Sequence, residues 1–226
     1  MFVRLFLDHP IVPHCALSIH PTQDHYLRRV MRCKTGDIIH IFNGQQGLWQ
    51  ASLARSCHVI PEKKVIEQPD KVRTVALAFS PIKQQNWLVE KGTEMGVTDF
   101  YPILCHRTVI RHFSQKRHVK ITHEACEQSQ RLHIPTLHPL QTLHTFIHSQ
   151  EHTGLSWTVL DPTSHNPLQA QKGTIALCIG PEGGWSPQER ASFSCAPHIY
   201  QAHIGSGILR AETAAVASLA VAQSTP

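Results

Sequence analysis

Short apolar runs separated by turn residues occupy the first seventy positions of the chain. The runs "FVRLFL" at 2–7, "IIHIF" at 38–42 and "LWQASLA" at 48–54 have strand-like composition. Asn43–Gly44 is a hairpin signal between the last two runs, because both residue types tolerate a positive φ. The pattern predicts a small β-barrel or sandwich.

One helix is predicted within this β-rich part. Thr22 can cap a helix over residues 23–32. Its apolar side chains share one face: Tyr26, Leu27, Val30 and Met31. Another side of the same helix gathers three cations: Arg28, Arg29 and Arg32.

Beyond residue 70 the pattern changes to alternating strands and helices. The stretch "PEKKVIEQPDK" at 61–71 is polar and holds two prolines, which predicts domains of residues 1–70 and 71–226. The order predicted for the second domain is strand 74–79, helix 84–95, strand 99–104, helix 115–131, strands 157–160, 174–179 and 198–204, and a final helix. This alternation predicts an α/β fold in which helices cover a parallel sheet.

Composition narrows the class of protein. The net charge is +5 and the pI is near 8.9, which suits an anionic partner such as nucleic acid. Seven cysteines form an odd set without a CxxC pair, so we expect reduced thiols, no zinc knuckle and a cytoplasmic location. No apolar run approaches the roughly 20 residues that span a bilayer, so we expect no membrane association.

Two glycine-bearing loops carry the candidate chemistry. Gly180–Gly184 follows an apolar strand and precedes a helix whose start is well specified by Ser186, Pro187 and Glu189. The second loop, 204–210, leads into an Ala-rich helix with Arg210 and Glu212 at its start. Parallel strands bind ligands at their carboxyl ends, so the two loops can grip a flat heterocycle through backbone groups. Ordinary turns and a helix-start ion pair are the alternative.

The combination of "IGPEGGWSPQE" with "IGSGILRAETAAVASLA" resembles the signature of the RsmE family, the bacterial ribosomal RNA small-subunit methyltransferases E. "HYLRRVMRCKTGD", "SPIKQQNWLVEKGTEMGV", "RTVIR" and "EACEQSQR" also resemble that family, so the likeness spans nearly the whole chain. The resemblance implies a SPOUT-type C-terminal domain with a trefoil knot and an N-terminal PUA-like β-barrel that binds RNA. It further implies a homodimer that methylates N3 of a uridine in 16S rRNA with S-adenosyl-L-methionine.

The resemblance assigns functions to individual positions. Arg210 and Glu212 would be catalytic, with a structural ion pair as the rival interpretation. The cofactor would be bound by Leu160, Ile179, Gly180, Pro181, Glu182, Gly183, Gly184, Ile204, Gly205, Ile208, Leu209 and Arg210. One departure is Gly207, which stands where the family pattern often has an arginine.

Basic residues are the candidate contacts with 16S rRNA or the small ribosomal subunit: Arg4, His25, Arg28, Arg29, Arg32, Lys34 and Lys83. A solvated helix face is the alternative for the arginine cluster. His144, His148 and His152 share a helical spacing, but no further ligand completes a zinc motif, so we expect no metal. Two other functions stay open: another SPOUT RNA methyltransferase acting on a ribose 2′-oxygen or another base, and a non-catalytic RNA-binding protein.

Overall fold

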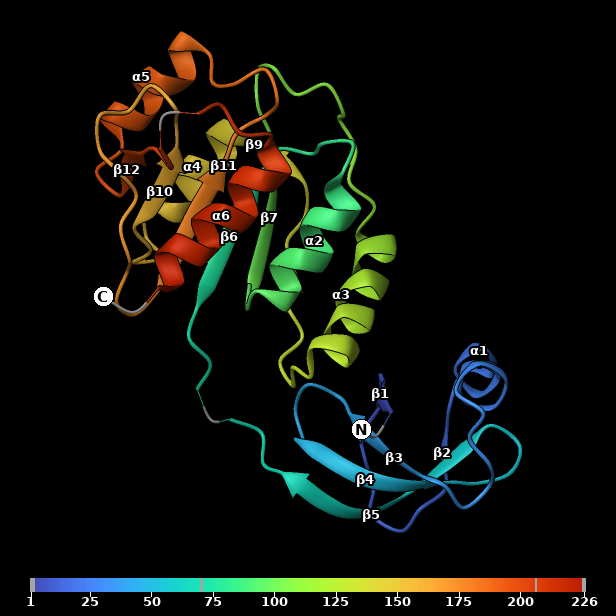
Figure 1. Ribbon diagram of the computed structural model, residues 1–226. Helices are drawn as coiled ribbons and strands as arrows, with labels where there is room; N and C mark the ends of the chain where they lie inside the picture. Colours follow the sequence, from blue (N-terminus) through green and yellow to red (C-terminus); the bar gives the residue numbers. More distant parts are fainter. Residues whose placement is uncertain (1–2, 70, 206, 225–226) are drawn as a thin grey trace. The chain divides into compact units, whose positions relative to one another are not determined.

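The computed structural model describes residues 3–69, 71–205 and 207–224 (Figure 1). The chain forms two units, residues 1–72 with 126–134 and residues 73–125 with 135–226. Residues 126–134 fall in the predicted second domain but group with the first unit. Asp70, at the predicted boundary, lies outside the described residues.

The first unit is built on a five-stranded sheet in the order β1-β3-β4-β5-β2. Its strands are β1 (Arg4–Phe6), β2 (Leu17–Ser18), β3 (Ile38–Phe42), β4 (Leu48–Leu53) and β5 (His58–Ile66). β3, β4 and β5 form an antiparallel meander, and β1 pairs parallel to β3. One face buries Leu5, Ile39 and Ile41, while Phe42 and Leu48 pack against Cys126.

The predicted helix differs from the structure in three respects. The segment folds as a short α-helix, α1 (Pro21–His25), followed by a π-helix, η1 (Tyr26–Val30). His20, not Thr22, is the N-cap, and it forms a capping box with Gln23. Of the predicted apolar face only Leu27 is buried, whereas Val30 is 60% exposed. A π-helical turn holds more residues than an α-turn, so the 3.6-residue spacing does not hold through this segment.

The polar stretch at 61–71 is only partly a linker. Residues 61–66 belong to β5 and pair with β4, which the sequence pattern did not predict. Pro61 stands opposite Ala51, next to a shift in the strand register. A proline is tolerated at such an irregularity because a ladder hydrogen bond is already lost there.

The second unit contains the parallel sheet that the sequence predicts, in the order β12-β10-β11-β6-β7-β8, with β9 also paired to β7. The strands are β6 (Val75–Phe79), β7 (Asp99–Leu104), β8 (Thr136–Leu137), β9 (Gln141–Thr142), β10 (Trp157–Leu160), β11 (Ile175–Ile179) and β12 (Ile199–Ala202). Each of these pairings is parallel. The carboxyl ends of these strands therefore share one edge of the sheet.

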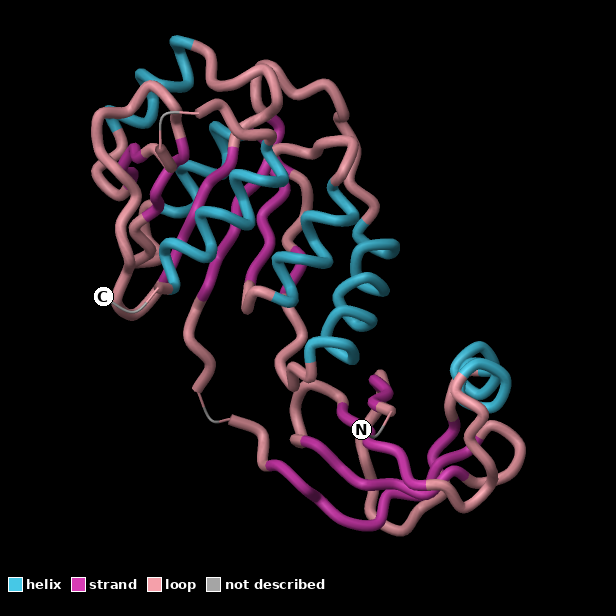
Figure 2. Tube along the Cα trace, viewed as in Figure 1, coloured by secondary structure: helices cyan, strands magenta, loops and turns pink. Residues whose placement is uncertain are grey.

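Helices cover both faces of this sheet (Figure 2). They are α2 (Gln85–Glu94), α3 (Gln115–Ser129), α4 (Leu143–Gln150), α5 (Pro187–Cys195) and α6 (Ala211–Gln223). Leu77 and Phe79 of β6 point into a core with α2 and α6, whereas Ala76 and Ala78 point into a second core with α4 and α5. This alternation explains why β6 is apolar throughout. In the described part of the chain, no helix is long and apolar enough to cross a membrane.

Candidate active site

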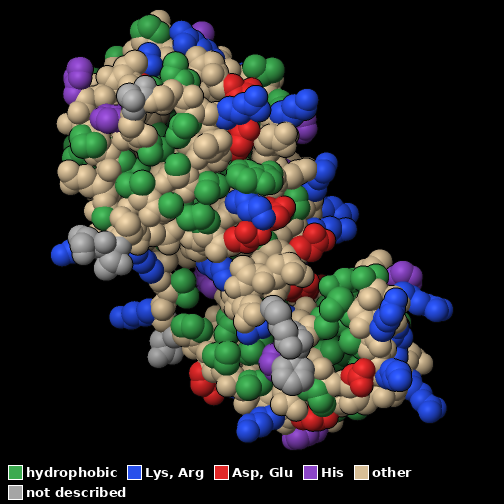
Figure 3. Space-filling view, in the orientation of Figure 1, with side chains coloured by type: hydrophobic (Ala, Val, Ile, Leu, Met, Phe, Trp, Pro, Cys, Tyr) green, Lys and Arg blue, Asp and Glu red, His purple; other side chains and the backbone are tan. Residues whose placement is uncertain are grey.

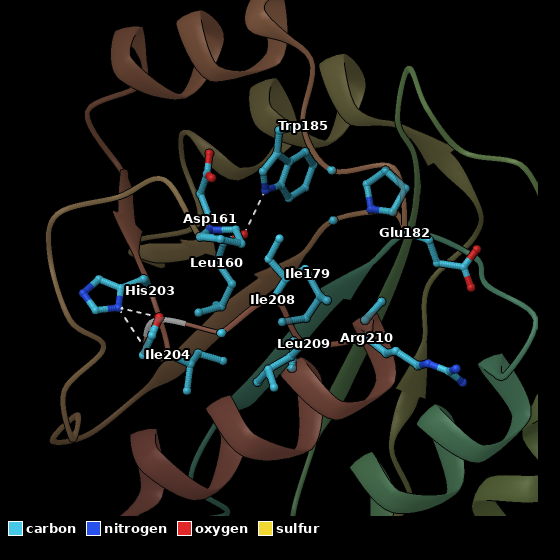
Figure 4. Close-up of a pocket in the computed structure, with 18 of the residues that line it drawn as sticks. Leu160, Asp161, Ile179, Glu182, Trp185, His203, Ile204, Ile208, Leu209 and Arg210 are labelled. Carbon is cyan, nitrogen blue, oxygen red and sulfur yellow. Dashed lines mark hydrogen bonds between the residues drawn. The ribbon is translucent and has the colours of Figure 1, made fainter.

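A cavity of about 290 Å³ lies at the carboxyl ends of β10, β11 and β12 (Figure 4). It is lined by residues from three segments at the ends of these strands, 160–162, 179–185 and 203–211, and by Arg190 and Ala214. Every predicted cofactor-binding residue except Gly183 lines it. Ser206, within the second predicted loop, lies outside the described residues. The structure thus brings together the two glycine-bearing loops that the sequence singles out.

The loop after β11 is held in one conformation. The backbone N–H of Gly184 donates to the carbonyl oxygen of Pro181 at 2.8 Å, and Gly184 has a φ of +70° that favours glycine. At Gly180, an added Cβ would lie 2.8 Å from Cε2 of Trp185. Ser186 and Glu189 form the predicted capping box at the start of α5. The glycines are therefore required by close approach and backbone conformation.

Gly183 lies on the side of this loop that faces another segment. Its carbonyl oxygen accepts a hydrogen bond of 2.9 Å from Nη1 of Arg107, and an added Cβ would lie 3.2 Å from Cβ of Arg107. Gly183 does not line the cavity. The close neighbour of Gly183 is therefore Arg107, and not a ligand in the cavity.

An ion pair between a buried carboxylate and a partly exposed arginine forms part of the cavity wall. Asp161, directly after β10, has a fully buried side chain and accepts a 2.6 Å hydrogen bond from Nε of Arg190 on α5. Burial alone would raise the pKa of Asp161, but hydrogen bonds from Arg190 and Thr163 outweigh it and hold the pKa below its ordinary value. Arg190 also donates to the carbonyl oxygen of Trp185. These bonds tie β10 to the start of α5.

The third segment closes the cavity on the side of α6. Nδ1 of His203 accepts from the backbone N–H of Gly205 at 3.0 Å. Arg210 is the N-cap residue of α6 and has an exposed side chain. Ala211 and Ala214 bring the first turn of this helix to the cavity. Gly207, the departure from the family pattern, is itself a lining residue.

The cavity is apolar at its centre and polar at its two sides. Figure 4 shows Leu160, Ile179 and Leu209 at the centre. Asp161 and His203 lie on one side, and Glu182 and Arg210 on the other. This combination of an apolar floor, polar sides and exposed backbone suits a ligand with a flat ring and polar substituents.

The two predicted catalytic residues are placed differently. Arg210 lines the cavity, whereas Glu212 is half-buried in the first turn of α6 and does not line it. In the described part of the chain no salt bridge joins Arg210 to Glu212, so the alternative of an ion pair between them finds no support.

Sequence reasoning missed several lining residues, among them Asp161, Trp185, Arg190 and His203. A signal was present for Asp161, because a carboxylate directly after a buried strand stands at the ligand-binding edge. Trp185 adjoins the glycine loop, but its inward orientation depends on the contact with Gly180. Arg190 and His203 are joined to the site by tertiary contacts that local sequence does not reveal.

Comparison with known proteins identifies the family. A model described as the RNA methyltransferase domain matches residues 67–223, and one described as the RNA methyltransferase PUA domain matches residues 23–60. The ribosomal RNA small subunit methyltransferase E of Synechocystis sp. is 30% identical over 236 residues, covering 97% of this chain and 77% of that protein. The chain belongs to this family of RNA methyltransferases.

Solved structures support the family fold. A putative methyltransferase from Legionella pneumophila, in complex with S-adenosylmethionine, has a TM-score of 0.82 at 25% identity, covering 99% of this chain and 97% of that one. The ribosomal RNA small subunit methyltransferase E of Neisseria gonorrhoeae has the same TM-score at 22% identity, covering 97% and 96%. The expected α/β fold with a PUA-like N-terminal part is confirmed. The trefoil knot stays a prediction.

The predicted RNA-binding residues lie on both units. Arg4, His25, Arg28, Arg29, Arg32 and Lys34 belong to the first unit, and Lys83 lies in the loop after β6 of the second. Arg28 donates to Asp24 and to the carbonyl oxygen of Ala54, and Arg4 donates to Gln130. Arg32 follows η1 with a φ of +58°. The exposed cations of the cluster are Arg29, Arg32 and Lys34.

The histidines of α4 do not form a three-ligand cluster. His144 and His148 lie one turn apart, with 3.2 Å between their Nε2 atoms, and His148 also contacts Glu151. α4 ends at Gln150, so His152 does not continue the helical face. Among the described residues, no group of three potential ligands is placed to bind a metal ion.

Proposed function

We propose that this protein transfers a methyl group from S-adenosyl-L-methionine to N3 of a uridine in 16S ribosomal RNA. Membership of the small-subunit methyltransferase E family supports the reaction and the RNA. The observation that carries the proposal is the cavity itself, formed by both glycine-bearing loops at the ligand-binding edge of the sheet.

The residues present fit this cofactor. Gly180 brings backbone groups to the cavity without a side chain in the way, and Leu160, Ile179 and Leu209 offer an apolar surface to a purine ring. When bound, S-adenosyl-L-methionine supplies an electrophilic methyl group on a sulfonium. The walls of the cavity position the reactants, which lowers the barrier to methyl transfer.

The chain must also remove a proton from the uridine. Neutral N3 has no free lone pair, so its proton must leave before or during attack on the methyl group. In this proposal Glu212 accepts the proton, and the guanidinium of Arg210 stabilises negative charge on the uridine oxygens. The placement of Arg210 in the cavity wall supports its role. The role of Glu212 is proposed from the family resemblance.

The remaining parts of the proposal concern assembly. The PUA-like unit contributes to RNA binding through Arg29, Arg32 and Lys34, whose side chains are exposed. The protein acts as a homodimer in the cytoplasm, on 16S rRNA or on the small subunit.

The test uses RNA from cells that lack this gene. Purified protein is incubated with S-adenosyl-L-methionine and either free 16S rRNA or small subunits, and modified nucleosides are mapped by mass spectrometry. We expect one new N3-methyluridine in at least one substrate. Methylation of a ribose, of another base or of nothing, or no calorimetric signal with millimolar cofactor, would overturn the proposal.

A further inference from the structure

The loop between β7 and α3, residues 105–114, lies next to the cavity but has no role in the mechanism above. Because β7 is parallel to β6, and β6 to β11, this loop leaves the same edge of the sheet as the loop that lines the cavity. Arg107 joins the two loops through its 2.9 Å hydrogen bond to the carbonyl oxygen of Gly183. Glu182 and Gly184, on either side of Gly183, line the cavity.

The base of this loop is firmly anchored. Thr108 is 6% exposed, and its Oγ1 accepts from the backbone N–H of Cys105 at 2.8 Å and lies 2.7 Å from Oγ of Ser80. The buried carboxylate of Glu189 accepts from the backbone N–H of His106 at 2.7 Å. Hydrogen bonds to buried groups of this kind hold a loop in one conformation.

The residue after Thr108 is presented to solvent. Val109 is 82% exposed, although its neighbour Thr108 is buried. Single exposed apolar residues are common on proteins, so exposure alone indicates nothing. Here the anchored backbone of the loop that Arg107 joins to the glycine loop holds Val109 outward.

The side chains on either side of Val109 within this loop carry positive charge. Arg107 and Arg111 flank it with exposed side chains, and the stretch "CHRTVIRHFS" at 105–114 contains no acidic residue. In the described part of the chain, Arg111 forms no salt bridge. Lys83, exposed in the loop after β6, adds a cation at this edge. Figure 3 shows Lys and Arg side chains, beside a few acidic ones, above α2 and α6.

We propose that the loop from His106 to His112 binds the RNA substrate beside the nucleotide to be methylated, with Arg111 on a phosphate and Val109 against an unstacked base. Cations that bracket an exposed apolar residue match a polymer whose phosphates alternate with apolar base faces. Arg107 is a positioning residue, because its bond to Gly183 fixes the distance between this loop and the cavity. The inference rests on the proposed RNA methyltransferase function.

The test compares charge reversals at the two edges of the same sheet. Arg111→Glu changes the proposed contact, and Lys172→Glu is the matched control, because exposed Lys172 precedes β11 at the opposite edge. Val109→Asp and Val109→Ala probe the apolar contact. Affinity for transcribed 16S rRNA is measured across salt concentrations, together with kcat/KM for its methylation. Cofactor affinity, thermal unfolding and oligomeric state are measured alongside.

Arg111→Glu should weaken RNA binding about tenfold and lower the salt slope by about one, since each phosphate contact contributes about that much. Val109→Asp should lower kcat/KM for RNA about tenfold, and Val109→Ala by less. The RNA affinity of Lys172→Glu should stay within about twofold of the wild-type value. Cofactor affinity and oligomeric state should not change in any variant.

Two results would overturn the inference while leaving the proposed function intact. If the wild-type protein methylates 16S rRNA and Arg111→Glu matches Lys172→Glu, the loop does not contact RNA. If the loop variants change the oligomeric state or cofactor affinity instead, the loop serves a subunit interface or the cavity. A wild-type protein that neither binds nor methylates rRNA removes the proposed function itself.

Discussion

The indole Nε1 of Trp185 donates a hydrogen bond of 2.9 Å to the carbonyl oxygen of Leu160. Trp185 is 1% exposed, and its ring lies where a side chain on Gly180 would be. One buried side chain therefore joins the end of β10 to the glycine loop after β11. The shape of the cavity depends on this contact, because both segments line it.

Gly180→Ala should disturb the cavity. The new Cβ would lie 2.8 Å from the Trp185 ring, and overpacking of this kind costs about 1–3 kcal/mol. If this cost falls on the cofactor-bound shape of the cavity, S-adenosyl-L-methionine affinity measured by calorimetry should fall by about five- to 150-fold, since 1.4 kcal/mol is a factor of ten. Gln188→Ala is the control, because Gln188 is exposed on α5 and does not line the cavity. Equal effects would show that Gly180 is not constrained by Trp185.

Trp185→Phe should destabilise the protein without removing the aromatic ring. The carbonyl oxygen of Leu160 would lose its donor in a buried place, which costs about 1–3 kcal/mol. Urea unfolding measures the change. Trp87→Phe is the control, because Trp87 lies on α2 and is 40% exposed. A loss of stability that is no larger for Trp185→Phe would contradict the role of this hydrogen bond.

The elements that the sequence predicts well are those whose signals are local. Ser186, Pro187 and Glu189 specify the start of α5 within four residues, and the structure shows the capping box. α1 and η1 were mispredicted because the π-helix changes the periodicity on which the prediction depended. The Asp161–Arg190 pair joins residues 29 positions apart, so no local pattern contains it. The candidate cofactor residues were found because the family resemblance supplied what periodicity could not.

Asp161→Asn should destabilise the protein in a pH-dependent way. The pKa of Asp161 is lowered in the folded state, so its carboxylate stabilises the fold above its unfolded pKa, which is about 3.9. That stabilisation is lost as the pH falls through the lower, folded-state pKa. At neutral pH the substitution should lower the free energy of unfolding by about 1–3 kcal/mol, because Arg190 loses a charged partner. This difference between the variant and the wild-type protein should shrink below about pH 4. Urea unfolding at neutral pH and below pH 4 measures this difference, and Glu182→Gln is the control because Glu182 is exposed. A cost that does not change with pH would contradict the pairing.

Charge reversal of Arg29 and Arg32 should weaken RNA binding while leaving cofactor affinity unchanged. Both side chains are exposed, whereas Arg28 bonds to Asp24 and Ala54 and its replacement would disturb the fold. The salt slope of binding should fall by about two, one for each phosphate contact. The double variant Arg55→Glu with Lys63→Glu is the matched control in the same unit. Equal losses in both double variants would indicate that general charge, not this cluster, attracts the RNA.

Arg210→Ala and Glu212→Gln separate the two proposed catalytic roles. Removing a group that stabilises developing charge lowers kcat by about 100- to 1,000-fold, and we expect this for Arg210→Ala. Removing a general base lowers kcat by about 100- to 10,000-fold, and we expect this for Glu212→Gln. Single-turnover methylation of 16S rRNA, with cofactor affinity measured separately, distinguishes these losses from weaker binding.

The pH profile of kcat decides what Glu212 does. If its carboxylate accepts the N3 proton, the pH profile of kcat differs in shape between the wild-type protein and the Gln variant, which has no carboxylate at this position. A Gln variant with full kcat would indicate that water accepts the N3 proton. Glu212 would then be a half-buried residue of the first turn of α6 without a catalytic role. Because Glu212 does not line the cavity, this measurement is the sharper test of the two. Arg210, which lines the cavity, would then be the one charged group of this helix start that acts on the uridine.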